Sequence, residues 1–414
     1  MKAAAGKKLD YKWVVAALCF LVMFVGLGFC SSAKNSYFQP IVESLNFSRS
    51  AFGVSDTFRY ATSSIVMMFL YRLIERFGTK KVICTGIACY TLSALINALS
   101  NTLIGFYIGG IFLGCAVACA GSTMISIIIN KWFTENKGTV LGIILAANAA
   151  GSATAIASLE SMIYSDGVGY KNAYFITAVA VASVLVIVAI FYKDTNSNEV
   201  SAPSKKKNTQ KGNEWEGFTY ETLTRKPAFY AVIICIALYS LSSASSITTP
   251  HFKDVGFSGE FIALNACVGS IVLMASKILA GIIYDRFGIK VSVNICLFTA
   301  LAGKIILFFV TPQTAALAIL HTVLIGIATP FETVMIPIIV LDLFGQRSFN
   351  KALAIITSLF TVGHALNAPL MNMPYDFMNS YIISFVLSTA AAAAIIIVLN
   401  FSMVSLKKRR KNDQ

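Results

Sequence analysis

Lys277 is a clear candidate for chemistry, because it lies deep inside a long apolar stretch of the sequence. A charged side chain in a membrane interior is costly and usually has a function. On a helix, Lys277 would lie roughly 12 Å from Asp285 at the end of the same stretch, so it could not easily reach water. Its ammonium group could therefore hold an anionic substrate, and a structural ion pair is the alternative interpretation.

Glu332 occupies a comparable position, between Pro330 and Pro337 near the middle of another apolar stretch. Prolines loosen the hydrogen-bond ladder of a membrane helix and suit a bending gate. The carboxylate could neutralise Lys277 in the empty protein, or it could carry a proton. A static bridge to Lys304 or another group is the alternative.

Five further polar side chains are candidates for contacts with a substrate: Lys34, Arg59, Asn148, Tyr239 and His364. Lys34 could meet an incoming anion or be a solvated lysine at a loop. Arg59 could pair with Asp56 on one helix face or could face a cavity. His364 could bind substrate, carry a proton or be a hydrogen-bonded core residue. Asn148 and Tyr239 could bind a ligand or a neighbouring helix.

Two other polar residues are assigned no role in binding. Lys304 is expected to find an ion-pair partner or to extend toward the membrane surface. His321 lies near the end of its apolar stretch and carries little signal.

The composition indicates what kind of molecule positions these residues. Apolar types make up 57% of the 414 residues and charged types only 13%, whereas soluble domains carry about 25% charged residues. A soluble protein could not hide so much apolar surface. We therefore expect an integral membrane protein, and the composition excludes a soluble enzyme, a disordered chain and a disulfide scaffold.

Several classes of partner are also disfavoured. The formal charge is +14, but the basic residues cluster between apolar stretches without interleaved aromatic residues, so nucleic acid is not an expected partner. The nine cysteines include no CxxC pair, and no HExxH or GxSxG motif occurs. We therefore expect neither enzymatic activity nor a cofactor or metal.

Twelve apolar stretches are long enough to cross a membrane as helices. In the first half they are 13–33, 51–73, 82–100, 103–130, 138–160 and 173–192. In the second half they are 228–250, 259–284, 291–311, 314–341, 352–373 and 378–404. The long polar stretch between spans six and seven predicts an N-terminal bundle at 1–192, a linker at 193–227 and a C-terminal bundle with a basic tail at 228–414.

The distribution of Lys and Arg predicts the orientation in the membrane. Of the 33 such residues, 26 fall in the termini, the linker and the loops on the same side, four fall on the opposite side, and three lie inside spans. Basic loops stay in the cytoplasm. We therefore expect a multi-pass protein of the cell membrane with both termini cytoplasmic and basic segments near anionic lipid.

A loop is repeated at an offset of 210 residues. Glu75-Arg76-Phe77-Gly78 follows the second span and Asp285-Arg286-Phe287-Gly288 follows the eighth. The repeat indicates two halves related by duplication. Gly78 and Gly288 would permit the tight turn, and the acid could pair with basic groups of a neighbouring helix, forming a conformational latch that is released when the loops part.

These residues resemble the signature of the major facilitator superfamily, Gly-x-x-x-Asp-Arg-x-Gly-x-Lys/Arg. Gly281, Asp285, Arg286, Gly288 and Lys290 match it. The first copy departs from the signature, with Tyr71 in place of Gly and Glu75 in place of Asp. The resemblance implies an all-helical fold of two six-helix bundles. It also implies a central cavity lined by spans 1, 4, 7 and 10, alternating access and a monomeric protein.

Within that superfamily the chain resembles the oxalate/formate antiporter and monocarboxylate transporter families. Lys277 lies four residues before Gly281, where those families carry an essential Arg, and Lys34 matches a Lys of the monocarboxylate transporters. The oxalate antiporter family has a substrate-contacting Lys in the helix that contains His364. The resemblance implies a carrier of a small carboxylate, such as lactate, pyruvate, formate or oxalate, by proton symport or anion exchange.

Two alternatives remain open on the sequence. An exporter of cationic or amphipathic compounds would use Glu332 and Asp56 as binding charges and Lys277 as a structural partner. A non-transporting sensor would bind a partner through the linker and the basic tail.

Overall fold

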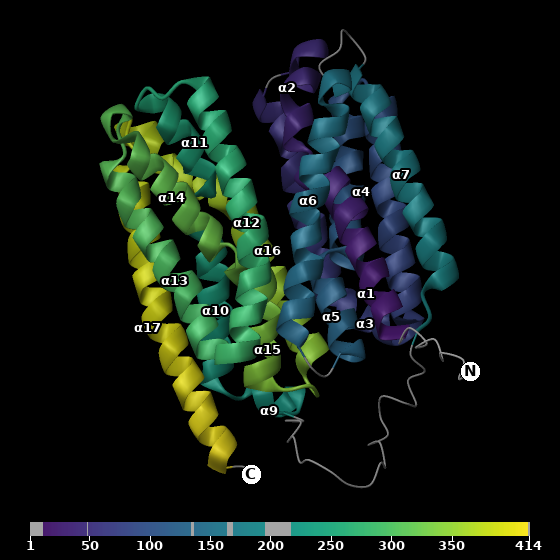
Figure 1. The fold of residues 1–414 in the computed structure, drawn as a ribbon, viewed down its shortest axis with the longest axis vertical. Coiled ribbons are helices and arrows are strands. Elements are labelled where there is room, and N and C mark those ends of the chain that lie inside the picture. Colours follow the sequence, from purple (N-terminus) through teal and green to yellow (C-terminus); the bar gives the residue numbers. More distant parts are fainter. Residues whose placement is uncertain (1–10, 48, 134–135, 164–168, 195–216, 413–414) are drawn as a thin grey trace, which may run out of the picture.

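The computed structural model describes residues 11–47, 49–133, 136–163, 169–194 and 217–412. Within these ranges the regular structure is helical. Figure 1 shows two groups of helices side by side, one from each half of the sequence. Helix α1 begins and α17 ends at the same end of the molecule, which we call the terminus side; the opposite end is the distal side.

The N-terminal bundle contains six spans among the described residues. Its elements are α1 (Tyr11–Leu21), η1 (Val22–Ser32), α2 (Asn35–Ser44), α3 (Arg49–Leu99), α4 (Leu103–Ala120), α5 (Ser122–Trp132), α6 (Lys137–Ile163) and α7 (Gly169–Phe191). Helix α3 contains two spans, because its backbone breaks at Gly78 with φ 81° and ψ 162°. A glycine without a Cβ adopts this conformation readily, as the sequence predicted for the turn.

The C-terminal bundle has the corresponding arrangement. Its elements are α9 (Tyr220–Thr224), α10 (Pro227–Leu241), α11 (Ser245–Asp254), α12 (Gly259–Phe287), α13 (Ile289–Ile306), η2 (Leu307–Phe309), η3 (Pro312–Thr314), α14 (Ala315–Ala328), η4 (Phe331–Met335), α15 (Ile336–Phe344), α16 (Phe349–Met378) and α17 (Ile382–Asn412). The short helix α9 lies in the C-terminal part of the predicted linker, where Phe218 N–H donates to the carbonyl of Phe344 at 3.1 Å.

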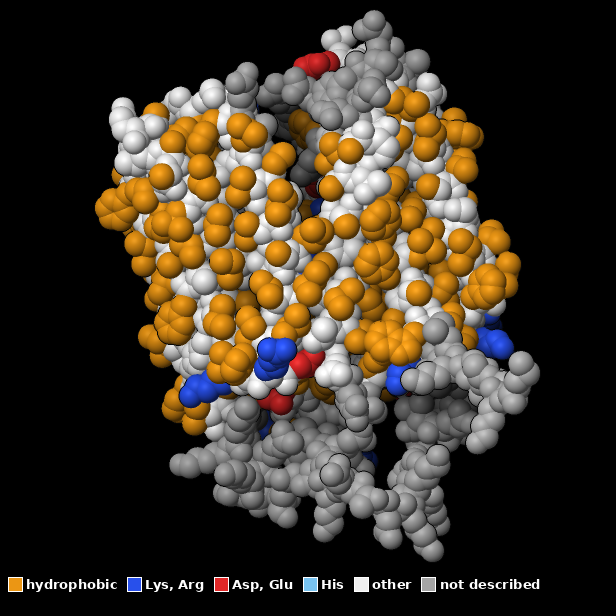
Figure 2. Space-filling model, viewed as in Figure 1, with side chains coloured by type: hydrophobic (Ala, Val, Ile, Leu, Met, Phe, Trp, Pro, Cys, Tyr) orange, Lys and Arg blue, Asp and Glu red, His pale blue; other side chains and the backbone are white. Residues whose placement is uncertain are grey.

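Eleven continuous helical segments of the described residues are long and apolar enough to cross a membrane. The segment Ala51–Leu99 is 49 residues long and is divided at Gly78, so it supplies two crossings and the spans number twelve. Large apolar side chains such as Ile65, Leu99 and Phe401 are exposed around the outside. Figure 2 shows that apolar side chains cover the flank, whereas charged ones gather toward the terminus side. The predicted membrane fold is confirmed.

Spans 1, 4, 7 and 10 are each interrupted near their middle. Span 1 changes to the wide turns of η1, span 4 breaks at Gly121, span 7 breaks between α10 and α11, and span 10 contains η4. Irregular backbone at membrane depth is tolerated where it is buried in protein or lines a cavity. The interruptions therefore expose backbone carbonyls where polar side chains can use them.

The two bundles are in contact on the terminus side and separated on the distal side. Figure 2 shows a narrow hollow between them that opens on the distal side, with charged side chains visible in its depth. Two seams hold the bundles together: α6 packs against α12, and α3 packs against α16. In the second seam the hydroxyls of Ser64 and Ser358 each donate to the other's carbonyl, at 3.0 and 2.8 Å.

Candidate functional site

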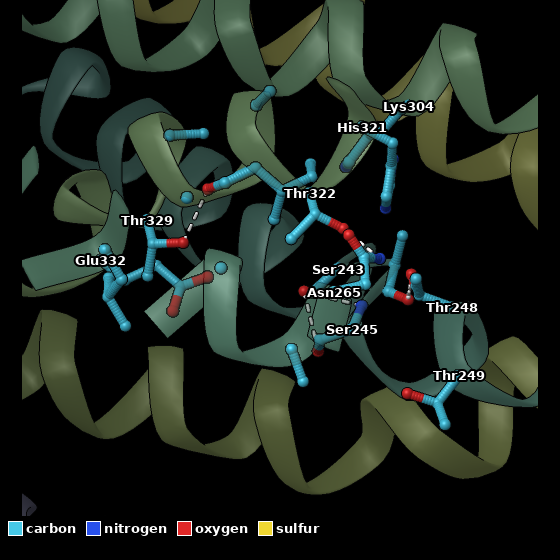
Figure 3. A pocket seen from close by; sticks show the side chains of 18 of the residues that line it. Ser243, Ser245, Thr248, Thr249, Asn265, Lys304, His321, Thr322, Thr329 and Glu332 are labelled. Atoms are coloured by element: carbon cyan, nitrogen blue, oxygen red, sulfur yellow. Dashed lines mark hydrogen bonds between the residues drawn. The ribbon is translucent and has the colours of Figure 1, made fainter. Parts of the chain in front are cut away.

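A cavity of about 330 Å³ lies in the C-terminal bundle, bounded by α10–α14, η4 and α16. Its polar lining comes from Ser and Thr side chains, Asn265, Lys304, His321, Glu332 and His364. Figure 3 shows Glu332 and Thr329 on one side of the cavity and Lys304, His321 and Thr322 on another. The volume is at the lower end of the range of about 300–1,000 Å³ that is usual for small-molecule sites.

Glu332 and His364 meet at this cavity from η4 and α16. The Glu332 carboxylate lies 3.6 Å from Nε2 of His364. The His364 ring stacks on Tyr60 of α3, with 6.2 Å between ring centroids, so it also contacts the opposite bundle. Tyr239 lines the same cavity and packs on Phe331. Glu332, His364 and Tyr239, all candidates from the sequence, thus lie together at this cavity. Glu332 does not form the ion pair with Lys277 that was one of its two expected roles.

Lys304 also belongs to this cavity, which the sequence interpretation missed. Its side chain is 4% exposed, and its ammonium donates to the carbonyls of Ser242 and Ser388 at 3.0 and 3.2 Å. It neither extends toward the membrane surface nor forms an ion pair within 4 Å among the described residues. The reason is that the break after α10 frees the Ser242 carbonyl inside the bundle, which the sequence of span nine does not reveal.

Lys277 lies outside the cavity, in the seam between α12 and α6. It is 2% exposed and donates to Oδ1 of Asn148 at 2.7 Å and to the carbonyl of Leu145 at 3.3 Å. Lys277 and Asn148 come from opposite bundles, so this contact must change if the bundles move apart here.

Lys34, Asp56 and Arg59 form a separate cluster in the N-terminal bundle. Oδ1 of Asp56 lies 2.9 Å from Nζ of Lys34 and 3.4 Å from Nε of Arg59. Lys34 is buried, so it is not a solvated loop lysine, and the predicted Asp56–Arg59 pair is present.

A series of polar contacts runs from this cluster toward the seam. Arg59 donates to Oγ of Ser31 at 3.2 Å. The adjacent Ser32 accepts from Nδ2 of Asn148 at 3.3 Å. Asn148 therefore stands between the η1 segment and Lys277 of the opposite bundle.

Two neutral groups in the cavity were also missed by the sequence interpretation. Asn265 donates through Nδ2 to Oγ1 of Thr322 at 2.7 Å. His321 is buried, with Nδ1 2.8 Å from the carbonyl of Gly303. Asn and Thr are common in membrane helices as helix-to-helix contacts, so their types alone did not distinguish them. The assignment of no role to His321 does not fit its place in the cavity wall.

The repeated loop forms a closed contact on the terminus side through its second copy. The Asp285 carboxylate accepts hydrogen bonds from the backbone N–H groups of Gly138 and Thr139 at 3.1 and 2.7 Å, and from the Thr139 hydroxyl at 2.6 Å. These donors lie in the first turn of α6, where a helix attracts anions. The expected basic partners are therefore replaced by a helix N-terminus of the opposite bundle.

The seam below this contact is closely packed through small residues. A Cβ on Gly281 would lie 2.1 Å from the Gly138 carbonyl, and one on Gly142 would lie 2.5 Å from the Lys277 carbonyl. Only glycine allows the two backbones to approach this far. Gly288 turns the chain with φ 78°, and the side chains of Arg286 and Lys290 are exposed on either side of it.

The first copy of the loop makes a different contact with the opposite bundle, since the ring of Tyr71, rather than Glu75, lies 4.6 Å from Nζ of Lys351 in α16. Glu75 accepts a hydrogen bond from the Tyr71 hydroxyl one turn earlier on the same helix, and Arg76 lies over the Phe77 ring. The expected symmetrical latch is therefore wrong for Glu75. Tyr71 replaces the signature glycine and takes the carboxylate that could otherwise reach the opposite bundle.

A model of the Major Facilitator Superfamily matches residues 16–368. The uncharacterized MFS-type transporter YcxA of Bacillus subtilis (strain 168) is 24% identical over 301 residues, covering 72% of this chain and 71% of that protein. Multidrug resistance protein 2 of the same organism is 24% identical, covering 72% of each protein. Monocarboxylate transporter 12 of Mus musculus is 22% identical, covering 77% of this chain and 70% of that protein.

Two solved structures share the fold. The proton:xylose symporter XylE superposes with a TM-score of 0.70 at 13% identity and covers 94% of both chains. The fucose:proton symporter FucP of E. coli superposes with a TM-score of 0.71 at 14% identity and covers 95% of this chain and 99% of that one. At these identities the similarity concerns the fold alone.

Proposed function

The chain belongs to the major facilitator superfamily, and from this premise we propose that it is a secondary active transporter of small organic anions. The charged group of the substrate is a carboxylate. The transport cycle is alternating access between the distal and the terminus side, by proton symport or anion exchange. Buried charge is the observation that supports this proposal.

Among the described residues, the polar cluster of each bundle holds more basic groups than carboxylates. In the C-terminal bundle Lys277 and Lys304 are buried without an ion-pair partner within 4 Å among the described residues, and the carboxylate of Glu332 lies against His364. In the N-terminal bundle Lys34 and Arg59 share Asp56. An unneutralised cation in a membrane interior is unfavourable. A carboxylate ligand would supply the missing negative charge, whereas a cationic ligand would increase the imbalance.

The position of Lys277 gives a reason for coupling between binding and movement. Its ammonium is held by Asn148 of the opposite bundle. A carboxylate bound in the C-terminal cavity adds negative charge to the bundle that carries Lys277, so the bound and the empty protein favour different bundle arrangements. His364 and Glu332 form the proposed proton-accepting pair in a symport cycle. Arg59 and Lys34 form the proposed distal contact for an incoming anion.

The rival function is export of cationic or amphipathic compounds, and the similarity to Multidrug resistance protein 2 supports it. Glu332 and Asp56 would then bind the substrate. Both carboxylates are already engaged by basic groups, so we favour the anion carrier.

Proteoliposomes containing the full chain would test the proposal. Uptake of labelled lactate, pyruvate, formate, oxalate and larger hydroxy acids would be measured with and without an inward proton gradient. We expect saturable uptake or exchange of at least one carboxylate, and a decrease of at least tenfold in Lys277→Ala. Stimulation by the gradient indicates symport, and stimulation by internal anion indicates exchange.

Lys171→Gln is the matched control. It removes a lysine charge at the distal end of α7, where Lys171 contacts Asn101 away from the cavity, so uptake should stay at the wild-type level. Failure of every carboxylate with folded protein, together with transport of organic cations, would overturn the proposal in favour of the exporter.

A further inference from the structure

We propose that the cavity in the C-terminal bundle selects polyhydroxylated carboxylates, with Lys304 binding the carboxylate and Asn265 accepting a hydrogen bond from a ligand hydroxyl. The inference rests on the proposed function and narrows its substrate class. It depends on four features of the cavity. These are the hydrogen-bond donors at one end, the hydrogen-bond acceptors along the wall, the pairing of Glu332 with His364, and the volume.

The donor end is formed by Lys304 and Thr322. A lysine ammonium has three N–H donors, and Lys304 donates to two acceptors, the carbonyls of Ser242 and Ser388. One donor is thus available to a ligand at the cavity wall. The Thr322 hydroxyl oxygen accepts from Asn265, so its own O–H can also be donated. A carboxylate is the ligand group that accepts from an ammonium and a hydroxyl together.

The remaining wall offers hydrogen-bond acceptors. Asn265 is 5% exposed, and its Oδ1 has no hydrogen-bond partner within the described part of the chain. The hydroxyls of Thr248 and Thr329 donate to carbonyls of their own helices, at 2.8 Å in each case. Their oxygen lone pairs remain open to the cavity. Buried acceptors are costly when they are unpaired, so this wall favours a ligand that carries several O–H donors.

The contact of Glu332 with His364 favours ligands with hydroxyl groups over ligands with amino groups. A ligand ammonium would need a carboxylate partner to offset its loss of hydration. The only carboxylate in the described cavity lining belongs to Glu332, and it already pairs with His364. The unpaired acceptor is instead the neutral amide oxygen of Asn265, which suits a neutral hydroxyl.

The volume favours a ligand larger than lactate or oxalate. At about 30 Å³ for each water-sized group, a cavity of about 330 Å³ holds roughly twice the non-hydrogen atoms of a three-carbon acid. A linear sugar acid of five or six carbons matches both this size and the number of acceptors in the wall.

A set of matched six-carbon ligands would test the inference on the purified full chain. Gluconate carries the carboxylate and the hydroxyls, hexanoate carries the carboxylate alone, glucose carries hydroxyls without the carboxylate, and norleucine carries an amino group in place of the hydroxyls. The ligand concentration giving half-maximal thermal stabilisation is the readout. We expect gluconate to act at a concentration at least tenfold below those of the other three, which corresponds to one satisfied buried hydrogen bond.

Two variants locate the selectivity. Asn265→Leu should weaken gluconate about tenfold and leave hexanoate within about twofold of wild type, because the acceptor for the ligand hydroxyl is lost while Lys304 still binds the carboxylate. Lys304→Gln should abolish the advantage of gluconate over glucose. Ser270→Ala, on an exposed position of the same helix, is the control and should change neither. If Asn265→Leu does not fold, Asn265→Ala removes the same acceptor and carries the same expectation for the gluconate-to-hexanoate ratio.

The outcomes separate the two proposals. If gluconate and hexanoate stabilise the protein at the same concentration, selection for ligand hydroxyls is wrong, but the proposed anion carrier is not contradicted. Strongest action by norleucine would also overturn this selection, in favour of amino acids. Stabilisation by glucose alone, or by none of the carboxylates, would overturn the proposed function together with this inference.

Discussion

Removing the carboxylate of Asp285 should open the terminus side of the protein. In Asp285→Ala the first turn of α6 loses three hydrogen bonds that cross from one bundle to the other. A hydrogen bond to a charged group contributes about 1.5–3 kcal/mol, and an anion at a helix N-terminus about 0.3–1 kcal/mol. Because Asp285 is exposed, solvent screening reduces these values. We expect a total of about 2 kcal/mol, or an increase of about thirtyfold in the open population.

Hydrogen–deuterium exchange measured by mass spectrometry can detect this change. The informative segment is the first turn of α16, residues 349–354, because none of its amide groups is bonded to Asp285. Faster exchange there reports separation of the bundles rather than the loss of one acceptor. Exchange on the distal side, in α2 and α11, should become slower as the hollow closes.

Glu75→Ala is the matched control for this experiment. Glu75 is the acid of the first loop copy, but it accepts a hydrogen bond from Tyr71 on its own helix. Because the Tyr71 ring lies 4.6 Å from Nζ of Lys351 in the reporter segment, removal of Glu75 should change exchange at 349–354 less than removal of Asp285 does. If Asp285→Ala leaves this segment unchanged, or if Glu75→Ala accelerates it equally, the one-sided latch inferred from the contacts is wrong.

Three further predictions concern other parts of the molecule. Glu332→Gln should retain exchange of internal for external anion but lose stimulation by a proton gradient, as measured in proteoliposomes; full gradient dependence would refute its role. Gly281→Val should lower transport at least tenfold, because its Cβ would meet the Gly138 carbonyl, and wild-type uptake would count against the close seam. Asp56→Asn should lower thermal stability by leaving two basic groups together, and adding Lys34→Met should restore part of the loss, whereas strict additivity would exclude the coupling.

The membrane fold and its duplication could be predicted from the sequence, because both depend on local patterns. Span length follows from apolar composition, and the turns at Gly78 and Gly288 follow from the backbone freedom of glycine. The Asp56–Arg59 pair could be predicted for the same reason, since both residues lie on one helix face.

The composition of the cavity could not be predicted in this way. Lys304 and Asn265 depend on partners that are distant in the sequence: Lys304 binds carbonyls of Ser242 and Ser388, and Asn265 binds Thr322. Such partners are set by bundle packing rather than by helical periodicity. The misassignment of Glu75 is different, because Tyr71 lies four residues before it and their spacing already allowed a bond along one helix.

The asymmetry between the two seams bears on how the bundles can move. The α6–α12 seam has glycines in close contact, the Asp285 bonds at its terminus end and the Lys277–Asn148 bond farther in. The α3–α16 seam has the reciprocal Ser64–Ser358 bonds, which join neutral groups. Charge-assisted bonds are the stronger kind, so a change of charge near Lys277 acts on the first seam more than on the second. A carboxylate bound in the C-terminal cavity would therefore act on the α6–α12 seam through Lys277, and on the α3–α16 seam only where His364 stacks on Tyr60. The neutral serine pair would then serve as the pivot about which the bundles rock.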